Sequence, residues 1–281
     1  MSESPTTAET TATEAVDSGR YLYCLVDLAA GSEETVDIAG IEDEPVSLVT
    51  AQSAPVGALV HRREEPFDST DLTKLRDWLL AHQQVVDAAG DRFGTPLPVR
   101  FDTIIEGDDG DVATWLDGHA TQITDAFDDL SGCWEYRVTL SWDSAAFETE
   151  QQTLDPELSD IQRRIEQSGD GTRFLLEKQF DQRLRELRRQ RETALAERLV
   201  DRLEPHSERL TERPVQSDAA ASLGIELDSD AVTQVALLAP PAAESALGST
   251  LDEITETPGV DVRFTGPWPP YTFAPQISEN E

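Results

Sequence analysis

Near its C-terminus the chain reads Gly266-Pro267-Trp268-Pro269-Pro270-Tyr271-Thr272-Phe273-Ala274-Pro275, a stretch called here the aromatic strip. Each of its prolines lacks an amide hydrogen and fixes its own φ, so the strip cannot continue a helix or a central strand and must run extended. It follows an alternating segment, Val260 to Phe264, that is typical of a β-strand. We therefore expect its three aromatic rings to lie at the edge of a sheet.

Two interpretations of the strip are open. As a latch, it would tie down the end of a domain and bury Trp268. As a docking segment, it would present Trp268, Tyr271 and Phe273 to a partner. Aromatic residues near a terminus usually hold that terminus in place, which favours the latch.

Composition predicts a folded, two-domain protein with an acidic surface. The 281 residues include 56 acidic and 22 basic ones, a net charge of -34, yet 38% of the chain is hydrophobic. That apolar content is too high for a disordered acidic chain. Lys74 and Lys178 are the lysines, and all other cations are arginines. Such a surface suits molar salt, where the Debye length is about 3 Å, so we expect a halophilic source.

The same features argue against several classes of function. Nucleic-acid binding needs a basic face, which a strongly acidic chain does not favour. We find no apolar run of membrane-spanning length and no signal peptide, so we expect a cytoplasmic protein. Cys24 and Cys133 lie in apolar, strand-like runs and are expected as free thiols.

No pattern for catalysis, a metal or a cofactor is present. The histidines are scattered, and we expect surface or helix-face positions for all four: His61, His82, His119 and His206. The acidic run from Glu106 to Asp111 lacks the ligand spacing of a calcium loop. The sequence therefore predicts no enzyme, no metal site and no cofactor.

The order of expected elements predicts an α+β protein of α/β type. We expect strands at 21–26, 46–49, 56–60, 96–101 and 134–140, with helices at 71–89 and 111–130 between them. Asp71 is expected to cap the start of the first of these helices, and Gly90 is expected to cap its end. Helices at 155–168 and 172–203 follow, and then a strand, helix and strand at 231–238, 244–257 and 260–264. The domain hypothesis is a disordered acidic tail (1–19), an N-terminal α/β domain (20–145), a C-terminal domain (146–275) and a short tail (276–281).

The long helix at 172–203 is the other candidate for partner binding. Its apolar residues are expected to form one stripe: Leu176, Phe180, Leu184, Leu187, Leu195, Leu199 and Leu203. More than half of the basic residues lie between Arg163 and Arg213. They can belong to a solvated surface helix with internal ion pairs, or Arg188, Arg189 and Arg191 can meet an acidic or helical partner.

Four segments together resemble one protein family. The strip resembles the "GPWPPYsF" ending of the gas vesicle GvpF/GvpL proteins, and Gly94 to Ile104 resembles their "vLPlRFGTvf" element. Tyr21 to Val26 and Gly171 to Lys178 are similar to their "lYgiv" and "GreYLekk" elements. Asp102 stands where the family usually has glycine, which leaves open whether the backbone makes a tight turn there. Phe174 replaces a tyrosine.

The resemblance implies an accessory gas vesicle protein whose second domain is ferredoxin-like with a long helical extension. It implies a minor component at the gas vesicle, acting in nucleation and assembly through contacts with the small shell protein and other accessory proteins, with no enzymatic activity. The alternative hypotheses are a ligand-sensing ferredoxin-like regulatory protein and a hydrolase of unknown type.

Overall fold

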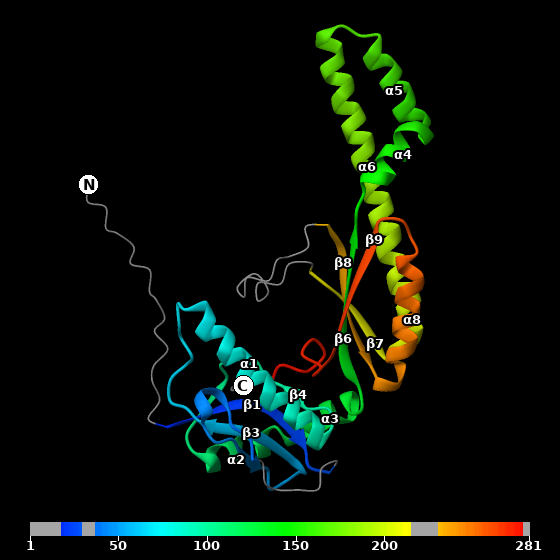
Figure 1. The fold of residues 1–281 in the computed structure, drawn as a ribbon. Helices are drawn as coiled ribbons and strands as arrows, with labels where there is room; N and C mark the ends of the chain where they lie inside the picture. Colours follow the sequence, from blue (N-terminus) through cyan, green and yellow to red (C-terminus); the bar gives the residue numbers. More distant parts are fainter. Residues whose placement is uncertain (1–17, 30–36, 215–229, 278–281) are drawn as a thin grey trace, which may run out of the picture. The chain divides into compact units, whose positions relative to one another are not determined.

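The computed structural model describes residues 18–29, 37–214 and 230–277. It contains two compact units (Figure 1). The first holds the described residues up to Gly132 together with those from Pro269 onward, and the second runs from Cys133 to Trp268.

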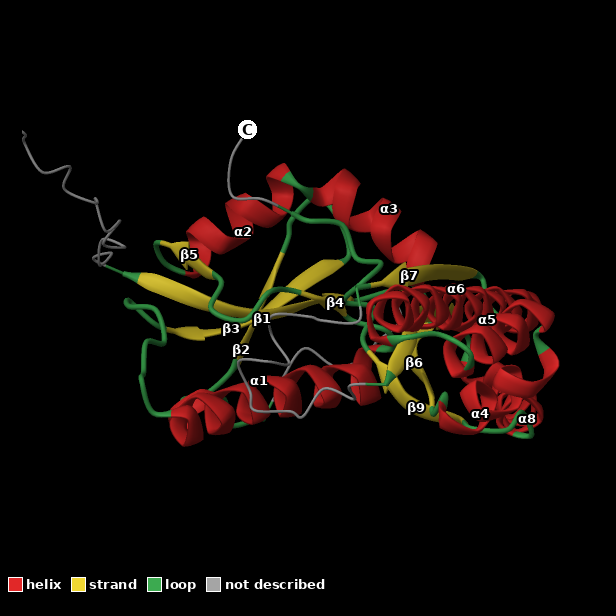
Figure 2. Ribbon diagram, turned by 90° about the horizontal axis from the view of Figure 1, so that it is seen from above, coloured by secondary structure: helices red, strands yellow, loops and turns green. Residues whose placement is uncertain are grey.

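Strands and helices alternate along the first unit. Its elements are β1 (Gly19–Asp27), β2 (Ser47–Thr50), β3 (Val56–Arg62), α1 (Leu72–Phe93), β4 (Leu97–Pro98), β5 (Ile104–Glu106), α2 (Asp109–Gly118) and α3 (Ala120–Leu130). The strands pair antiparallel in the order β2-β3-β1-β4, and β5 also pairs with β1. Helix α1 covers one face of this sheet, and α2 and α3 cover the other (Figure 2).

The ends of the helices follow local chemistry. Asp71 caps α1 as expected, because its side chain accepts a hydrogen bond from the Thr73 amide at 2.9 Å. The expected C-cap at Gly90 is wrong: Gly90 is buried within the helix, which continues to the buried Phe93 and ends at Gly94 with φ 81°. The single helix expected over 111–130 is two helices, since the backbone leaves helical values at His119.

The second unit contains a four-stranded sheet and the longest helix. Its elements are β6 (Trp134–Trp142), α4 (Ala145–Leu154), α5 (Pro156–Glu166), α6 (Asp170–Leu203), β7 (Arg209–Arg213), β8 (Ala231–Ala239), α8 (Glu244–Thr255) and β9 (Val260–Trp268). The strands pair antiparallel in the order β7-β8-β6-β9. The core packs β6 and β8 against the C-terminal part of α6 and against α8.

The division into units differs from the expected domains. Strand β6 was expected in the N-terminal domain, but it pairs with β8 and β9 along almost its whole length. The segment from Pro269 to Pro275, expected in the C-terminal domain, belongs to the first unit. Gly19, expected in the tail, begins β1, whereas residues 1–17 and 278–281 lie outside the described residues. A strand's own sequence does not show which sheet supplies its partners, so these assignments needed the structure.

Helices α4, α5 and α6 form an arm that includes the N-terminal half of α6 (Figure 1). Leu158 and Ile161 of α5 are buried, as is Leu176 of α6. At the base of the pair, the Arg183 guanidinium lies 2.9 Å from Asp155, whose other oxygen accepts a hydrogen bond from the Leu158 amide. Asp155 therefore caps α5 and fixes its register on α6.

The apolar residues of α6 follow the stripe expected from sequence, which shifts gradually around the helix, with Phe180, Leu184 and Leu187 half-buried between its two buried ends. Leu176 is buried in the arm, whereas Leu195, Leu199 and Leu203 are buried in the core of the second unit. At about 100° per residue, the step from Leu176 to Leu195 turns the helix by roughly 100° beyond whole turns. The two halves of α6 therefore bury different sides.

Candidate functional site

The three arginines predicted as a partner-binding face are not equivalent in the structure. Arg188 lies 2.9 Å from Glu192 and 3.8 Å from Glu148 of α4, and these carboxylates raise the pKa of its guanidinium. Arg191 is half-buried, whereas Arg189 is exposed and has no ion pair in the described part of the chain. The structure therefore leaves Arg189 the most available of the three.

The aromatic strip is divided between the two units. Gly266, Pro267 and Trp268 extend β9, so the strand is longer than expected and reaches Glu135 of β6. Gly266 has φ 134°, and a Cβ there would lie 2.8 Å from the Glu135 carbonyl oxygen, so this position requires glycine. Trp268 is half-buried, and its indole nitrogen donates to the Thr265 hydroxyl at 3.4 Å.

The second part of the strip packs onto the first unit. Pro269 and Pro270 are buried, and Tyr271 and Phe273 are half-buried. The Tyr271 hydroxyl donates to the side-chain oxygen of Gln83 in α1 at 3.0 Å. The strip is thus held at both ends, while Trp268, Tyr271 and Phe273 keep part of their surface accessible.

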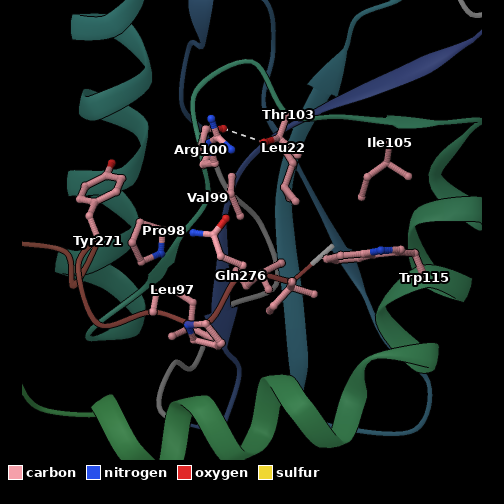
Figure 3. Close-up of a pocket in the computed structure, with 14 residues that line it drawn as sticks. Leu22, Leu97, Pro98, Val99, Arg100, Thr103, Ile105, Trp115, Tyr271 and Gln276 are labelled. Atoms are coloured by element: carbon pink, nitrogen blue, oxygen red, sulfur yellow. Dashed lines mark hydrogen bonds between the residues drawn. The ribbon is translucent and has the colours of Figure 1, made fainter. Parts of the chain in front are cut away.

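A cavity of about 100 Å³ lies beside this segment in the first unit (Figure 3). Its walls are mostly apolar: Leu22, Leu25, Leu97, Pro98, Val99, Ile105 and Trp115 from the sheet and α2, and Ala274, Pro275 and Ile277 from the C-terminal segment. The Trp115 indole nitrogen is buried and has no hydrogen-bond partner among the described residues. The cavity is small beside the 300 to 1,000 Å³ or so of a typical ligand pocket.

Two buried tyrosine–histidine pairs form the centre of the first core, a feature that sequence reasoning missed. His61 and His82 were expected at surface or helix-face positions, but they are only 1% and 4% exposed. The Tyr23 hydroxyl lies 2.5 Å from His61 Nδ1, and the Tyr21 hydroxyl lies 2.8 Å from His82 Nδ1. The alternation of Tyr21 and Tyr23 toward one face of β1 was the available signal.

Hydrogen bonding assigns the proton positions of these pairs. The Tyr23 hydroxyl accepts from the Ile41 amide, and the Tyr21 hydroxyl accepts from the Asp102 amide, so each hydroxyl hydrogen is free to point at an Nδ1 atom. Each neutral imidazole then carries its hydrogen on Nε2. The pKa of both histidines is lowered to about 4, by burial at His82 and by burial together with the nearby Arg63 at His61.

The backbone at Asp102 makes the tight turn that was left open because the family usually has glycine at this position. Its φ is 68°, in the left-handed region that favours glycine, so the tight turn is kept. The Asp102 side chain accepts a hydrogen bond from the Phe67 amide at 2.8 Å. Aspartate tolerates this conformation better than most residues, and the bond holds it in place.

The acidic run from Glu106 to Asp111 has a structural role. Asp108 accepts hydrogen bonds from the amides of Gly110 and Asp111, and Asp111 accepts from the Asp108 amide, which forms a capping box for α2. In the parts of the chain that the structure describes, no cluster of three potential metal ligands occurs. A search of the same residues for a helix long and apolar enough to cross a membrane also finds none.

Comparison with known proteins gives the family. Residues 19–275 match the family described as gas vesicle synthesis protein GvpL/GvpF. The chain is 45% identical to gas vesicle protein L1 of Halobacterium salinarum, covering 98% of both chains. It is 38% identical to gas vesicle protein L of Haloferax mediterranei, over 93% of this chain and 89% of that protein.

The fold is also known from crystal structures. The structure of GvpF from Anabaena sp. superposes with a TM-score of 0.73 at 23% identity, covering 94% of this chain and all of the other. GvpF from Microcystis aeruginosa gives a TM-score of 0.65 at 19% identity. The two antiparallel sheets with their helices are therefore a GvpF-like α+β fold. The chain belongs to the GvpL/GvpF family of gas vesicle proteins, a family not known for enzymes, and has a role in gas vesicle formation.

Proposed function

We propose that this protein is an accessory component that acts in nucleation and assembly of the gas vesicle, and that it binds the small shell protein and other accessory proteins. The arm carries this proposal. Leu154, Phe174 and Leu175 of the arm are 58% to 62% exposed, and the adjacent Phe174 and Leu175 place two large apolar side chains together at the surface. A stable arm that presents apolar side chains is suited to a contact that forms only in a larger assembly.

The six residues predicted to contact a partner, three arginines of α6 and three aromatic residues of the strip, remain part of this proposal, but the structure does not leave them equally accessible. Arg189 is exposed and unpaired within the described chain, whereas Arg188 already has two carboxylate partners and Arg191 is half-buried. Trp268, Tyr271 and Phe273 have a structural role and could add only their accessible edges to an interface. A ferredoxin-like second unit is also part of the proposal, and the antiparallel order β7-β8-β6-β9 supports it.

Capture experiments test the proposal. The tagged chain is mixed in molar KCl with the shell protein, and separately with each accessory protein from the same gene cluster. We expect direct capture of at least one of them, and loss of capture when residues 157–181 of the arm are replaced by a short turn. A variant without the arm that captures every partner as well as the parent would refute the role of the arm.

The ligand-sensing alternative has less support from the geometry. The cavity in Figure 3 would hold only a few water molecules or one small side chain at about 100 Å³. The larger hollows of the described surface, such as the one lined by Glu157, Asp160, Arg164 and Gln179, are open and lined mainly by charged and polar residues. Neither arrangement encloses a cofactor-sized ligand.

A further inference from the structure

One side of α6 changes from buried to exposed along the helix. Leu199 and Leu203 lie on the side that packs into the core of the second unit. Phe174 precedes Leu199 by about seven helical turns, and Arg185 precedes Leu203 by about five, so all four lie on the same side of the helix. In its N-terminal half, where α6 belongs to the arm, this side is exposed.

The exposed part of that side combines apolar and cationic residues. Phe174 and Leu175 are 58% and 61% exposed, whereas the neighbouring Leu176 is only 3% exposed. Lys178, Arg185 and Arg189 follow at the helical spacing that keeps them on this side, and all three are exposed. We call the five residues Phe174, Leu175, Lys178, Arg185 and Arg189 the α6 seam.

The cations of the seam lack carboxylate partners. Within the described residues, no ion pair involves Lys178, Arg185 or Arg189, and the Lys178 ammonium lies 5.0 Å from the Phe174 ring centroid. By contrast, Arg183 on the opposite side of α6 and Arg188 at the edge of the seam have carboxylates within 3 Å. Asp181 and Glu192 are the acidic residues on this side of the helix, and Glu192 is already paired with Arg188, so among the described residues the three unpaired cations face one unpaired carboxylate. In a chain of net charge -34, this local excess of cations is unusual.

We propose that the α6 seam is the docking site for an acidic amphipathic helix of another protein. The apolar residues of that helix would cover Phe174 and Leu175, and its flanking carboxylates would pair with Lys178, Arg185 and Arg189. The spacing of the seam over about four turns matches the ridges along which two helices pack. In molar salt the Debye length is about 3 Å, so only direct, partly desolvated ion pairs contribute to recognition.

This inference rests on the proposed function, because it names the chemistry of a partner of the arm. The probe is a synthetic four-turn peptide, cross-linked to hold it helical, with leucines on one side and glutamates on both flanks. Its counterpart has lysines in place of the glutamates. Binding of each labelled peptide to the full chain is measured by fluorescence anisotropy in molar KCl.

We expect the glutamate peptide to bind at least about tenfold more tightly than the lysine peptide, and Phe174→Ser to weaken it by roughly tenfold. Arg185→Glu together with Arg189→Glu should reverse the preference. The matched control is Arg163→Glu with Arg164→Glu, which makes the same change of charge on α5 and should leave the preference unchanged. Equal binding of both peptides, or equal loss in the control, overturns the proposal.

Two further measurements separate this proposal from its alternatives. Sedimentation should give the same oligomeric state for the parent chain and for the variant with Arg185→Glu and Arg189→Glu. If instead the parent is a dimer and this variant is a monomer, a second copy of the chain occupies the seam, which overturns the proposal. In cells, the seam variant should form no gas vesicles and the α5 control should form them. If deletion of the whole chain abolishes vesicles but the seam variant makes them normally, the proposed function stands and the seam assignment fails.

Discussion

Acid should destabilise the first unit through its two buried histidines. In the folded chain the pKa of both His61 and His82 lies at about 4, below the ordinary value of about 6.5. The unfolded chain therefore takes up these protons first. The stability that the neutral histidines contribute is fully present above about pH 6.5 and is lost as the pH falls toward 4.

The size of this loss in unfolding free energy follows from the two pKa values. Between pH 7 and pH 5, each histidine should remove about 2 kcal/mol of unfolding free energy, or about 4 kcal/mol for the two if they act independently. That is a large share of the roughly 5 to 15 kcal/mol that stabilises a typical domain. Each buried Nε2–H also lacks a partner among the described residues, so the folded core offers no acceptor to stabilise an added charge.

Urea-dependent hydrogen exchange in molar KCl, read on peptides from β1 and α1, measures this loss for the first unit alone. In His82→Gln, the amide oxygen can still accept the Tyr21 hydroxyl hydrogen but cannot titrate, so about half of the loss should disappear. His206→Gln, outside this core, is the matched control and should leave the loss unchanged. If the parent loses less than about 1 kcal/mol between pH 7 and pH 5, the reasoning is wrong.

Three other predictions concern stability. The fold should weaken as KCl is lowered from molar to about 0.1 M, because self-repulsion of a net charge of -34 is then less screened; circular dichroism showing equal stability across this range would contradict it. Asp155→Ala removes the cap of α5 and the partner of Arg183, and should speed hydrogen exchange in α5 with a cost of about 1 to 2 kcal/mol. Trp268→Ala should cost roughly 2 kcal/mol, less than the 3 to 5 of a fully buried ring, as measured by the urea midpoint of the second unit.

Local signals predicted single elements well. The Asp71 cap, the strand β1 and the extent of α6 all depend on residues close in sequence, and the structure has them nearly as expected. Pairing between distant segments was not predictable in this way. Strand β7 is short and mostly polar, with exposed Arg209 and Glu212, so its sequence gives no alternation that would identify it before β8 is placed beside it.

The burial of polar side chains was the other feature that could not be predicted from sequence. His61 stands at the end of an apolar strand and His82 on the inner side of α1, and neither position excludes a surface location by its own sequence. Only the meeting of β1, β3 and α1 places both imidazoles within hydrogen-bond distance of Tyr21 and Tyr23. The same holds for the candidate contact residues of α6. Ion pairs to α4, such as that between Arg188 and Glu148, decide which arginines remain available to a partner, and these pairs form only in the folded chain.

The aromatic strip shows why one short motif can be read both as a latch and as a contact segment. Gly266 brings β9 against the Glu135 carbonyl, where no side chain fits, so the motif completes the edge of the second sheet. Three residues later the same motif enters the first unit, where two prolines are buried and Tyr271 bonds to Gln83 of α1. Because these roles need the glycine, the prolines and the tyrosine hydroxyl, the structural demand on the motif leaves only ring edges for a partner. We therefore expect substitutions in the strip to act first on stability and those in the α6 seam to act first on binding.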